Sequence, residues 1–147
     1  MMGRKRHILV DTEGFLLKAT VHAADITDRN AVHLVLAGLT TVFPRLRHLW
    51  VDAGYSGKGA AWIRETLGWT VEVVKRPQRW IWLPEGAEPP PMPTGFQVLK
   101  RRWVVERTFA WLGRYRRLSK DYEVLPASEE AWISLATTNL LLRRLAR

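Results

Sequence analysis

Asp52 lies at the end of a stretch that reads as a short buried strand, "RHLWVD". In open α/β sheets, ligands gather beyond the carboxyl ends of strands, where strand ends and helix N-termini converge. Gly54 and Gly57 follow the acid and allow the chain to turn sharply beside it. Asp52 is therefore a candidate site residue. The alternative is that its side chain caps the next turn by accepting hydrogen bonds from backbone amides.

Glu106 is the second candidate, because it is an acid on an otherwise basic helical face. The segment "KRRWVVERTFAWLGRYRRL" has helical periodicity with one broad apolar arc. Four and seven residues after Glu106 stand Ala110 and Gly113, which leave room for a bulky group beside the carboxylate. The alternative is an ordinary ion pair with Arg102, worth roughly a few tenths of a kcal/mol. The arginines of this face are Arg102, Arg107, Arg114 and Arg117.

Together these two acids suggest metal-assisted chemistry on a phosphodiester. Carboxylate oxygens are the hard ligands that Mg²⁺ prefers, and arginines can neutralise the neighbouring phosphates. In two-metal sites the ions lie about 3.5–4 Å apart and stabilise the attacking and leaving oxygens. The sequence therefore predicts a metal site at Asp52 and Glu106, which usually requires a third carboxylate.

The charge of the chain points to a polyanionic partner. Its 147 residues carry 23 Lys plus Arg against 14 Asp plus Glu, a formal net charge of +9. Nucleic acid is the first candidate and an anionic membrane surface the second. A basic protein without such a partner is the alternative.

Composition also excludes several classes of function. The chain contains no cysteine, which excludes disulfides, a thiol nucleophile and a zinc–thiolate site. No apolar run approaches the roughly 18–20 residues that span a bilayer. These features are typical of a cytoplasmic protein.

Periodicity predicts strands and helices in alternation over the first half of the chain. "HILVDTEGFLLKATVH" reads as a hairpin, and "DITDRNAVHLVLAGLTTVF" as a helix with Asp28 as its N-cap. After the strand that ends at Asp52, "SGKGAAWIRETLG" reads as a helix opened by Ser56 and closed by Gly68. "WTVEVVKR", stopped by Pro77, completes a predicted parallel βαβ unit.

The second half is predicted to be a loop followed by two helices. The Pro- and Gly-rich stretch from Pro84 to Gly95 predicts an exposed loop. Helical periodicity then returns over residues 97–118, and a last helix is expected to start with Ser128 as its cap. The order predicts an α/β fold in one domain over residues 1–147.

Five stretches resemble the C-terminal region of the DDE transposases of bacterial insertion sequences, in the family-five group: "GRKRHILVDTEGFLL", "HAADITDR", "WVDAGYSG", "RRWVVERTFAWLGRYRRLSKDYE" and "LLLRRLA". The resemblance covers nearly the whole chain, and its last two motifs together are the most specific. It implies an RNase H-like mixed sheet with flanking helices, catalytic Asp, Asp and Glu residues, and Mg²⁺ as cofactor, with Mn²⁺ as an alternative.

Residue by residue, Asp52 matches the second Asp of the family and Glu106 matches its Glu. Arg102 matches the family's arginine on the same helix, whereas Gly113 stands where a lysine is often found. The first Asp of the family lies on a central strand upstream of "GRKRH", so the chain is expected to lack that strand and that ligand. Asp11, Asp25 and Asp28 could substitute for it, although Asp11 is expected at a hairpin turn and Asp28 at an N-cap.

The leading hypothesis is the C-terminal part of a transposase that cleaves element ends and joins them to target DNA. Its expected partners are DNA, an upstream half or a full-length transposase, and further copies of the chain, at the bacterial nucleoid. The alternative is an inactive nucleic-acid-binding remnant or an inhibitor of a full-length transposase. An RNase H-like nuclease or resolvase is a third class, against which the "WVVERTFAWLGRYRRL" motif argues.

Overall fold

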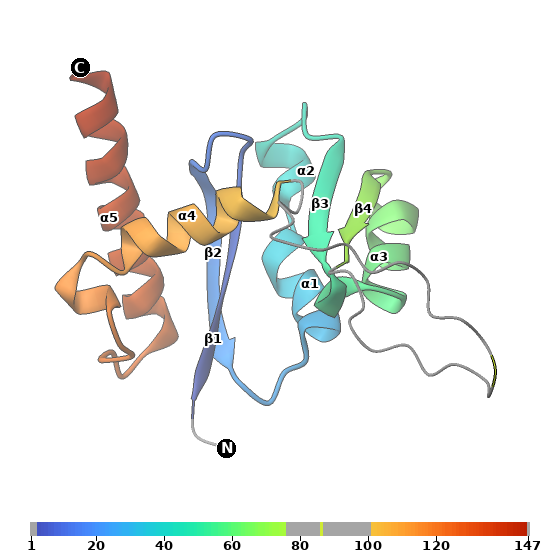
Figure 1. Cartoon of the computed structure of the whole chain (residues 1–147), viewed down its shortest axis with the longest axis horizontal. Helices are drawn as coiled ribbons and strands as arrows, with labels where there is room; N and C mark the ends of the chain where they lie inside the picture. Colours follow the sequence, from blue (N-terminus) through green and yellow to red (C-terminus); the bar gives the residue numbers. More distant parts are fainter. Residues whose placement is uncertain (1–2, 76–85, 87–100, 147) are drawn as a thin grey trace.

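The computed structural model describes residues 3–75, 86 and 101–146 (Figure 1). They form a mixed α/β fold, which confirms the fold class at this level. The helices and strands are β1 (Arg4–Val10), β2 (Leu16–Ala23), α1 (Asp28–Leu36), α2 (Leu39–Val42), β3 (His48–Asp52), η1 (Ala53–Tyr55), α3 (Lys58–Trp62), η2 (Ile63–Leu67), β4 (Thr70–Val74), α4 (Arg102–Leu112), η3 (Arg116–Leu118) and α5 (Pro126–Leu145).

The predicted hairpin is confirmed as the antiparallel pair β1 and β2, in which Arg4 lies opposite Ala23. Its turn is closed by the Asp11 carboxylate, which accepts hydrogen bonds from the backbone N–H groups of Glu13 (2.8 Å) and Phe15 (2.9 Å). Gly14 takes the left-handed conformation, with φ of 86°, that the turn requires. Asp11 thus has the local role expected of a turn residue.

The predicted parallel unit is also confirmed, because β3 and β4 pair in parallel with His48 opposite Thr70. The connecting helix differs from the prediction at its start. It begins at Lys58 after Gly57, whose φ is 68°, and Ser56 makes no cap. Its last turns widen into the π-helix η2, which ends at Gly68 as expected.

The helix predicted from Asp28 through Phe43 is divided into two. Gly38 adopts φ of 77° and separates α1 from α2. The N-cap of α1 is Thr27, so the prediction that Asp28 caps this helix is wrong. Asp28 is instead the first residue of the helix, and its carboxylate is available for other contacts.

The last two helices are shifted relative to the sequence-based limits. α4 begins at Arg102, and residues 97–100 lie outside the described part of the chain. α5 begins at Pro126 after Leu125, so Ser128 is not its cap; proline at the first helical position already has the required φ. Of the loop predicted between Pro84 and Gly95, only Gly86 is described.

Two small sheets and two hydrophobic cores make up the described fold. β1 and β2 form one sheet, and β3 and β4 form the other. One core joins α1 and α3 to the β3–β4 sheet and includes Val32, Leu49, Ile63 and Trp69. The other joins α5 to the hairpin and includes Val21 and Ile133. Figure 1 shows α5 beside the hairpin and α1 between the hairpin and the β3–β4 sheet.

No helix among the described residues is long and apolar enough to cross a membrane.

Candidate active site

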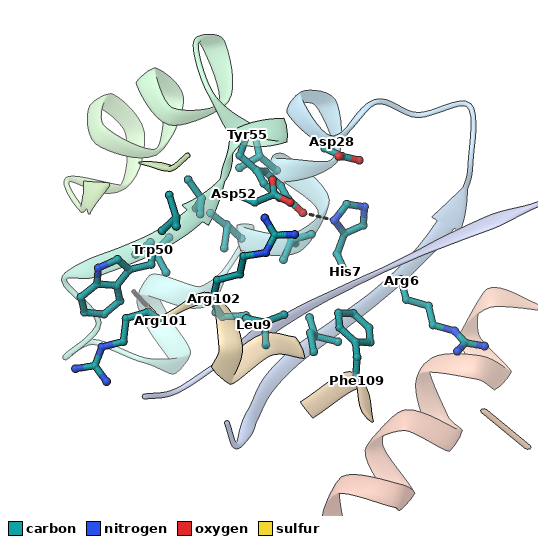
Figure 2. Close-up of a pocket in the computed structure, with 18 of the residues that line it drawn as sticks. Arg6, His7, Leu9, Asp28, Trp50, Asp52, Tyr55, Arg101, Arg102 and Phe109 are labelled. Carbon is teal, nitrogen blue, oxygen red and sulfur yellow. Dashed lines mark hydrogen bonds between the residues drawn. The ribbon is translucent and has the colours of Figure 1, made fainter. Parts of the chain in front are cut away.

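A cavity of about 530 Å³ lies between the two sheets (Figure 2). It is bordered by β1 and β3, and α1 and α4 complete its walls. Most of its lining is apolar, but all four elements contribute charged residues to it. These are Lys5, Arg6, Asp28, Asp52, Arg102 and Glu106, with Arg101 just before α4. Figure 2 shows that the Arg6 side chain itself is directed away from the cavity, toward α5.

Asp52 is the last residue of β3, directly before η1, and it lines this cavity. One of its carboxylate oxygens accepts a hydrogen bond from the Gly54 backbone N–H at 2.8 Å. The turn-capping role considered for Asp52 is therefore present. That bond occupies only Oδ1, so a cap and a position at a ligand site are compatible here.

Asp28 lies close to Asp52 in the structure; it is one of the three acids that the sequence offered as substitutes for the family's first Asp. A Cβ added at Gly54 would lie 2.7 Å from Asp28 Oδ2 and 3.0 Å from Asp52 Oδ1. Both carboxylates therefore lie close to the same glycine, one carried by α1 and the other by the end of β3. Lys5 Nζ donates to Asp28 Oδ1 at 3.1 Å and balances part of this charge.

His7 and Tyr55 form a buried polar pair beside these acids. The Tyr55 hydroxyl is hydrogen-bonded to His7 Nδ1, and the His7 ring stacks on His22. Burial, followed by the nearby His22, lowers the pKa of His7 below its usual value of 6.5. Burial, followed by the charges of Asp28 and Asp52, raises the pKa of Tyr55. Tyr55 therefore stays a neutral hydroxyl, which suits it to fix the His7 ring.

Glu106 reaches the cavity from α4, together with Arg102. Arg102 Nε donates to Glu106 Oε1 at 2.7 Å, so the ion pair considered as an alternative is present. The Glu106 side chain is 60% exposed, so this bond is weak and easily exchanged. Val105 and Phe109 lie on the same stripe of α4 and line the apolar part of the cavity. Figure 2 shows the Arg102 side chain directed into the cavity on the side of Asp52.

The other three predicted arginines lie outside the lining of this cavity. Arg107 Nη2 donates to the Glu13 carbonyl at 2.6 Å, and its guanidinium lies over the rings of Trp103 and Trp111. Arg117 pairs with Glu123 at 2.7 Å. Arg114 is exposed at the end of α4. The structure thus brings together Asp52, Glu106 and Arg102, and separates them from the remaining arginines.

The acids of this cavity carry the type of oxygen ligand that a hard divalent cation such as Mg²⁺ prefers. Two carboxylates converge at Gly54, and Glu106 opens onto the same cavity. Within residues 3–75, 86 and 101–146, however, no three His, Cys, Asp or Glu side chains are close enough to hold one ion. Only Asp28 and Asp52, both beside Gly54, are shown close to each other among these acids of the described residues.

Carboxylates and arginines around one cavity, at the end of a parallel strand, are typical of α/β proteins that act on phosphate-containing ligands. The family model described as "Transposase DDE domain" matches residues 1–141. The chain therefore belongs to the DDE transposase domain family, which processes DNA in transposition and generally uses a divalent metal ion. No curated protein and no solved structure matches the chain.

Proposed function

We propose that the chain is the catalytic part of an insertion-sequence transposase of the family-five group, with residues 1–147 forming a single RNase H-like domain. The observation that carries this proposal is the position of Asp52, Glu106 and Arg102. Asp52 ends β3, whereas Arg102 and Glu106 belong to α4. The two acids are 54 residues apart along the chain, and all three residues line the same cavity. Family membership supplies the reaction class.

In this proposal Asp52 and Glu106 are the catalytic acids and the ligands of Mg²⁺, for which Mn²⁺ can substitute. When bound, the ion would supply Lewis-acid stabilisation of the charge that develops on the phosphodiester oxygens. Arg102 donates a hydrogen bond to Glu106 at the edge of the cavity. Its remaining guanidinium N–H groups can donate to a phosphate oxygen.

The reaction proposed is strand cleavage followed by strand transfer. Water attacks a phosphodiester at the element end, the bond to the 3′ oxygen breaks, and a 3′-hydroxyl is released. That hydroxyl then attacks a phosphodiester of the target DNA. Arg102, Arg107, Arg114 and Arg117 contact the DNA backbone; for Arg107 this requires that phosphate replace the Glu13 carbonyl as its acceptor.

The proposal includes protein partners at the nucleoid. An upstream half of the transposase, or a full-length transposase, supplies the third catalytic acid, and further copies of the chain assemble on the DNA ends.

The test is Mg²⁺-dependent cleavage of a labelled duplex that carries the element ends, with and without the upstream polypeptide. We expect Asp52→Asn and Glu106→Gln to lose cleavage by about 10²-fold or more while DNA binding changes little. The matched control is Glu65→Gln, which alters an exposed acid away from the cavity. Unchanged cleavage in either site variant would refute the assignment.

A nucleic-acid-binding module without catalysis is the second candidate. This candidate is favoured by one observation: in the part of the chain that the structure describes, no three possible metal ligands lie close together. Such a module binds DNA through phosphate contacts, so its affinity falls steeply with salt and shows no base preference. A metal titration separates the two candidates, because only the first requires a divalent ion.

A further inference from the structure

Asp52 and Glu106 are held by different parts of the fold. Glu106 belongs to α4, and the buried Thr108 of the same helix donates from Oγ1 to the Gly14 carbonyl at 2.9 Å. α4 is thus fastened to the turn of the hairpin. Asp52 ends β3, which pairs with β4 in the other sheet. The separation of the two acids therefore depends on contacts that hold the end of β3 against the hairpin.

One such contact runs from η1 to β1. Tyr55 is the last residue of η1, and its hydroxyl is hydrogen-bonded to His7 Nδ1. His7 lies in the middle of β1 opposite Thr20 of β2, so the hairpin carries its ring. Figure 2 shows this bond next to the Asp52 side chain. The bond therefore ties the turn after Asp52 to the sheet on which α4 is anchored.

The surroundings of this bond favour a fixed geometry. His7 is 8% exposed, and its ring stacks on that of His22 with centroids 4.7 Å apart. The Tyr55 ring meets the His7 ring edge to face, with centroids 5.8 Å apart. Burial lowers the pKa of His7 and raises that of Tyr55, so both groups are neutral in the folded chain at neutral pH. A hydrogen bond in such an environment is stronger than one that water can replace.

The neighbouring polar contact of β1 is more exposed and holds a different element. Lys5 Nζ donates to Asp28 Oδ1 at 3.1 Å, but both side chains are 36% exposed. Ion pairs of that exposure hold their geometry weakly, because water and salt compete with them. This pair fastens α1, whereas the Tyr55 bond fastens the segment that directly follows Asp52.

We infer that Tyr55 and His7 are positioning residues of the active site. Their bond holds the end of β3 against β1 and thereby sets the separation of Asp52 from Glu106. The Tyr55 hydroxyl keeps its proton and is engaged with His7, so it acts through the position of Asp52 and not as a base. The inference rests on the proposed function only for the roles of the two acids.

The experiment measures the separation of the two parts of the fold in the full chain, without metal or DNA. The sequence contains no cysteine, so spin labels can be attached at Thr66→Cys on η2 and Ala110→Cys on α4, both exposed positions. Pulsed electron–electron double resonance gives the distribution of distances between the labels. We expect Tyr55→Phe, which removes only the hydroxyl, to widen or displace this distribution. Tyr115→Phe, in the other hydrophobic core, is the matched control and should leave it unchanged.

A matched pair of variants at His7 tests the same bond from its other end. Asparagine and leucine have nearly the same shape, but only asparagine keeps a polar atom close to the position of Nδ1. His7→Asn should therefore keep the wild-type distribution, whereas His7→Leu should change it as Tyr55→Phe does. Circular dichroism establishes that each variant is folded, and the His7 pair tests the bond even if Tyr55→Phe does not fold.

The kinetics of DNA cleavage give a second readout. Tyr55→Phe should lower kcat by about tenfold or more, because misplacement of catalytic groups by an ångström can cost about 10²-fold. KM for DNA should stay close to the wild-type value, because the Tyr55 hydroxyl does not contact the substrate in this account. A loss of stability alone would reduce the amount of folded protein and leave the distance distribution of the folded chain unchanged.

Three results would overturn the inference. One is the same distance distribution in Tyr55→Phe, His7→Leu and the wild-type chain. Another is an equal change in Tyr115→Phe, which would mean that any substitution in a core loosens the fold. The third is an unchanged kcat in Tyr55→Phe despite an altered distribution. An altered distribution in Tyr55→Phe, together with no cleavage by the wild-type chain, would count against the proposed function alone.

Discussion

The carboxylates of Asp28 and Asp52 both lie close to Gly54, in space that a side chain at this position would occupy. A Cβ at Gly54 would lie 2.7 Å and 3.0 Å from oxygens of the two acids, closer than such contacts normally allow. Gly54→Ala should therefore displace one or both carboxylates. We expect Mg²⁺-dependent cleavage to fall by up to about 10²-fold, because misplacement of catalytic groups by an ångström has effects of that size.

The matched control for this substitution is Gly59→Ala. Its added Cβ would meet its nearest neighbour, the Arg29 backbone, at 3.7 Å, an ordinary contact. It should leave cleavage unchanged and raise helix propensity slightly. Equal cleavage by Gly54→Ala and the wild-type chain would show that the spacing of the two carboxylates has no part in the reaction.

His7 gives the fold a dependence on pH. Burial lowers its pKa in the folded chain below the ordinary 6.5, so between these two pKa values the unfolded chain binds more protons. The free energy of unfolding should therefore fall as the pH drops below about 6.5, and the contribution of His7 is fully present above it. Lys5, His22, Asp28 and Asp52 surround the ring and set the size of the effect.

Urea unfolding of His7→Gln between pH 5 and pH 8 measures this contribution. The variant should show a flatter dependence on pH than the wild-type chain, whatever its overall stability. His33→Gln, at an exposed position, is the control and should keep the wild-type slope. A wild-type slope in His7→Gln would mean that another group carries the dependence.

At the scale of elements, a buried ion pair fastens β1 to α5. Glu129, which is 1% exposed, accepts a hydrogen bond from Arg6 Nε. Arg6 also donates to the carbonyls of Leu118 (2.8 Å) and Lys120 (3.1 Å), so the guanidinium fixes three segments at once. No local sequence pattern indicates this long-range partner of Arg6.

Removal of the acid should be strongly destabilising. We expect Glu129→Ala to lower the free energy of unfolding by about 3–5 kcal/mol, because it leaves a partly buried guanidinium without its counter-charge. The double variant Arg6→Met/Glu129→Leu should recover much of this loss. Glu65→Ala, at an exposed position, should change stability by less than about 0.5 kcal/mol. A small effect of Glu129→Ala in urea unfolding would show that water replaces the carboxylate readily.

Elements with strong local signals were predictable from the sequence. The hairpin follows from two apolar runs around the Asp11–Gly14 turn, and the parallel pair follows from two apolar strands with a helix between them. Helix limits were less predictable, because they depend on backbone conformation at single residues. The left-handed Gly38 divides α1 from α2, although the apolar periodicity continues through it.

At the scale of the whole molecule, the site could be predicted only in part. Asp52 and Glu106 were identified by their neighbours along the chain and by family resemblance. Asp28 was only one of three possible substitutes for the first Asp, because its local pattern also fits a helix cap and only the packing of α1 against η1 brings it to Gly54. The cavity between the two sheets likewise depends on how the two strand pairs lie relative to each other, which no local pattern encodes.

The central claim is that Asp52 and Glu106 share one metal site. The most direct test is paramagnetic broadening of the amide signals of the full chain by substoichiometric Mn²⁺. If Asp52 and Glu106 bind one ion, broadening should be centred on residues 52–54 and 102–106, and excess Mg²⁺ should relieve it. The broadening should be reduced in Glu106→Gln but not in Glu65→Gln. Broadening that leaves both segments unaffected, or that is the same in Glu106→Gln and the wild-type chain, would contradict it.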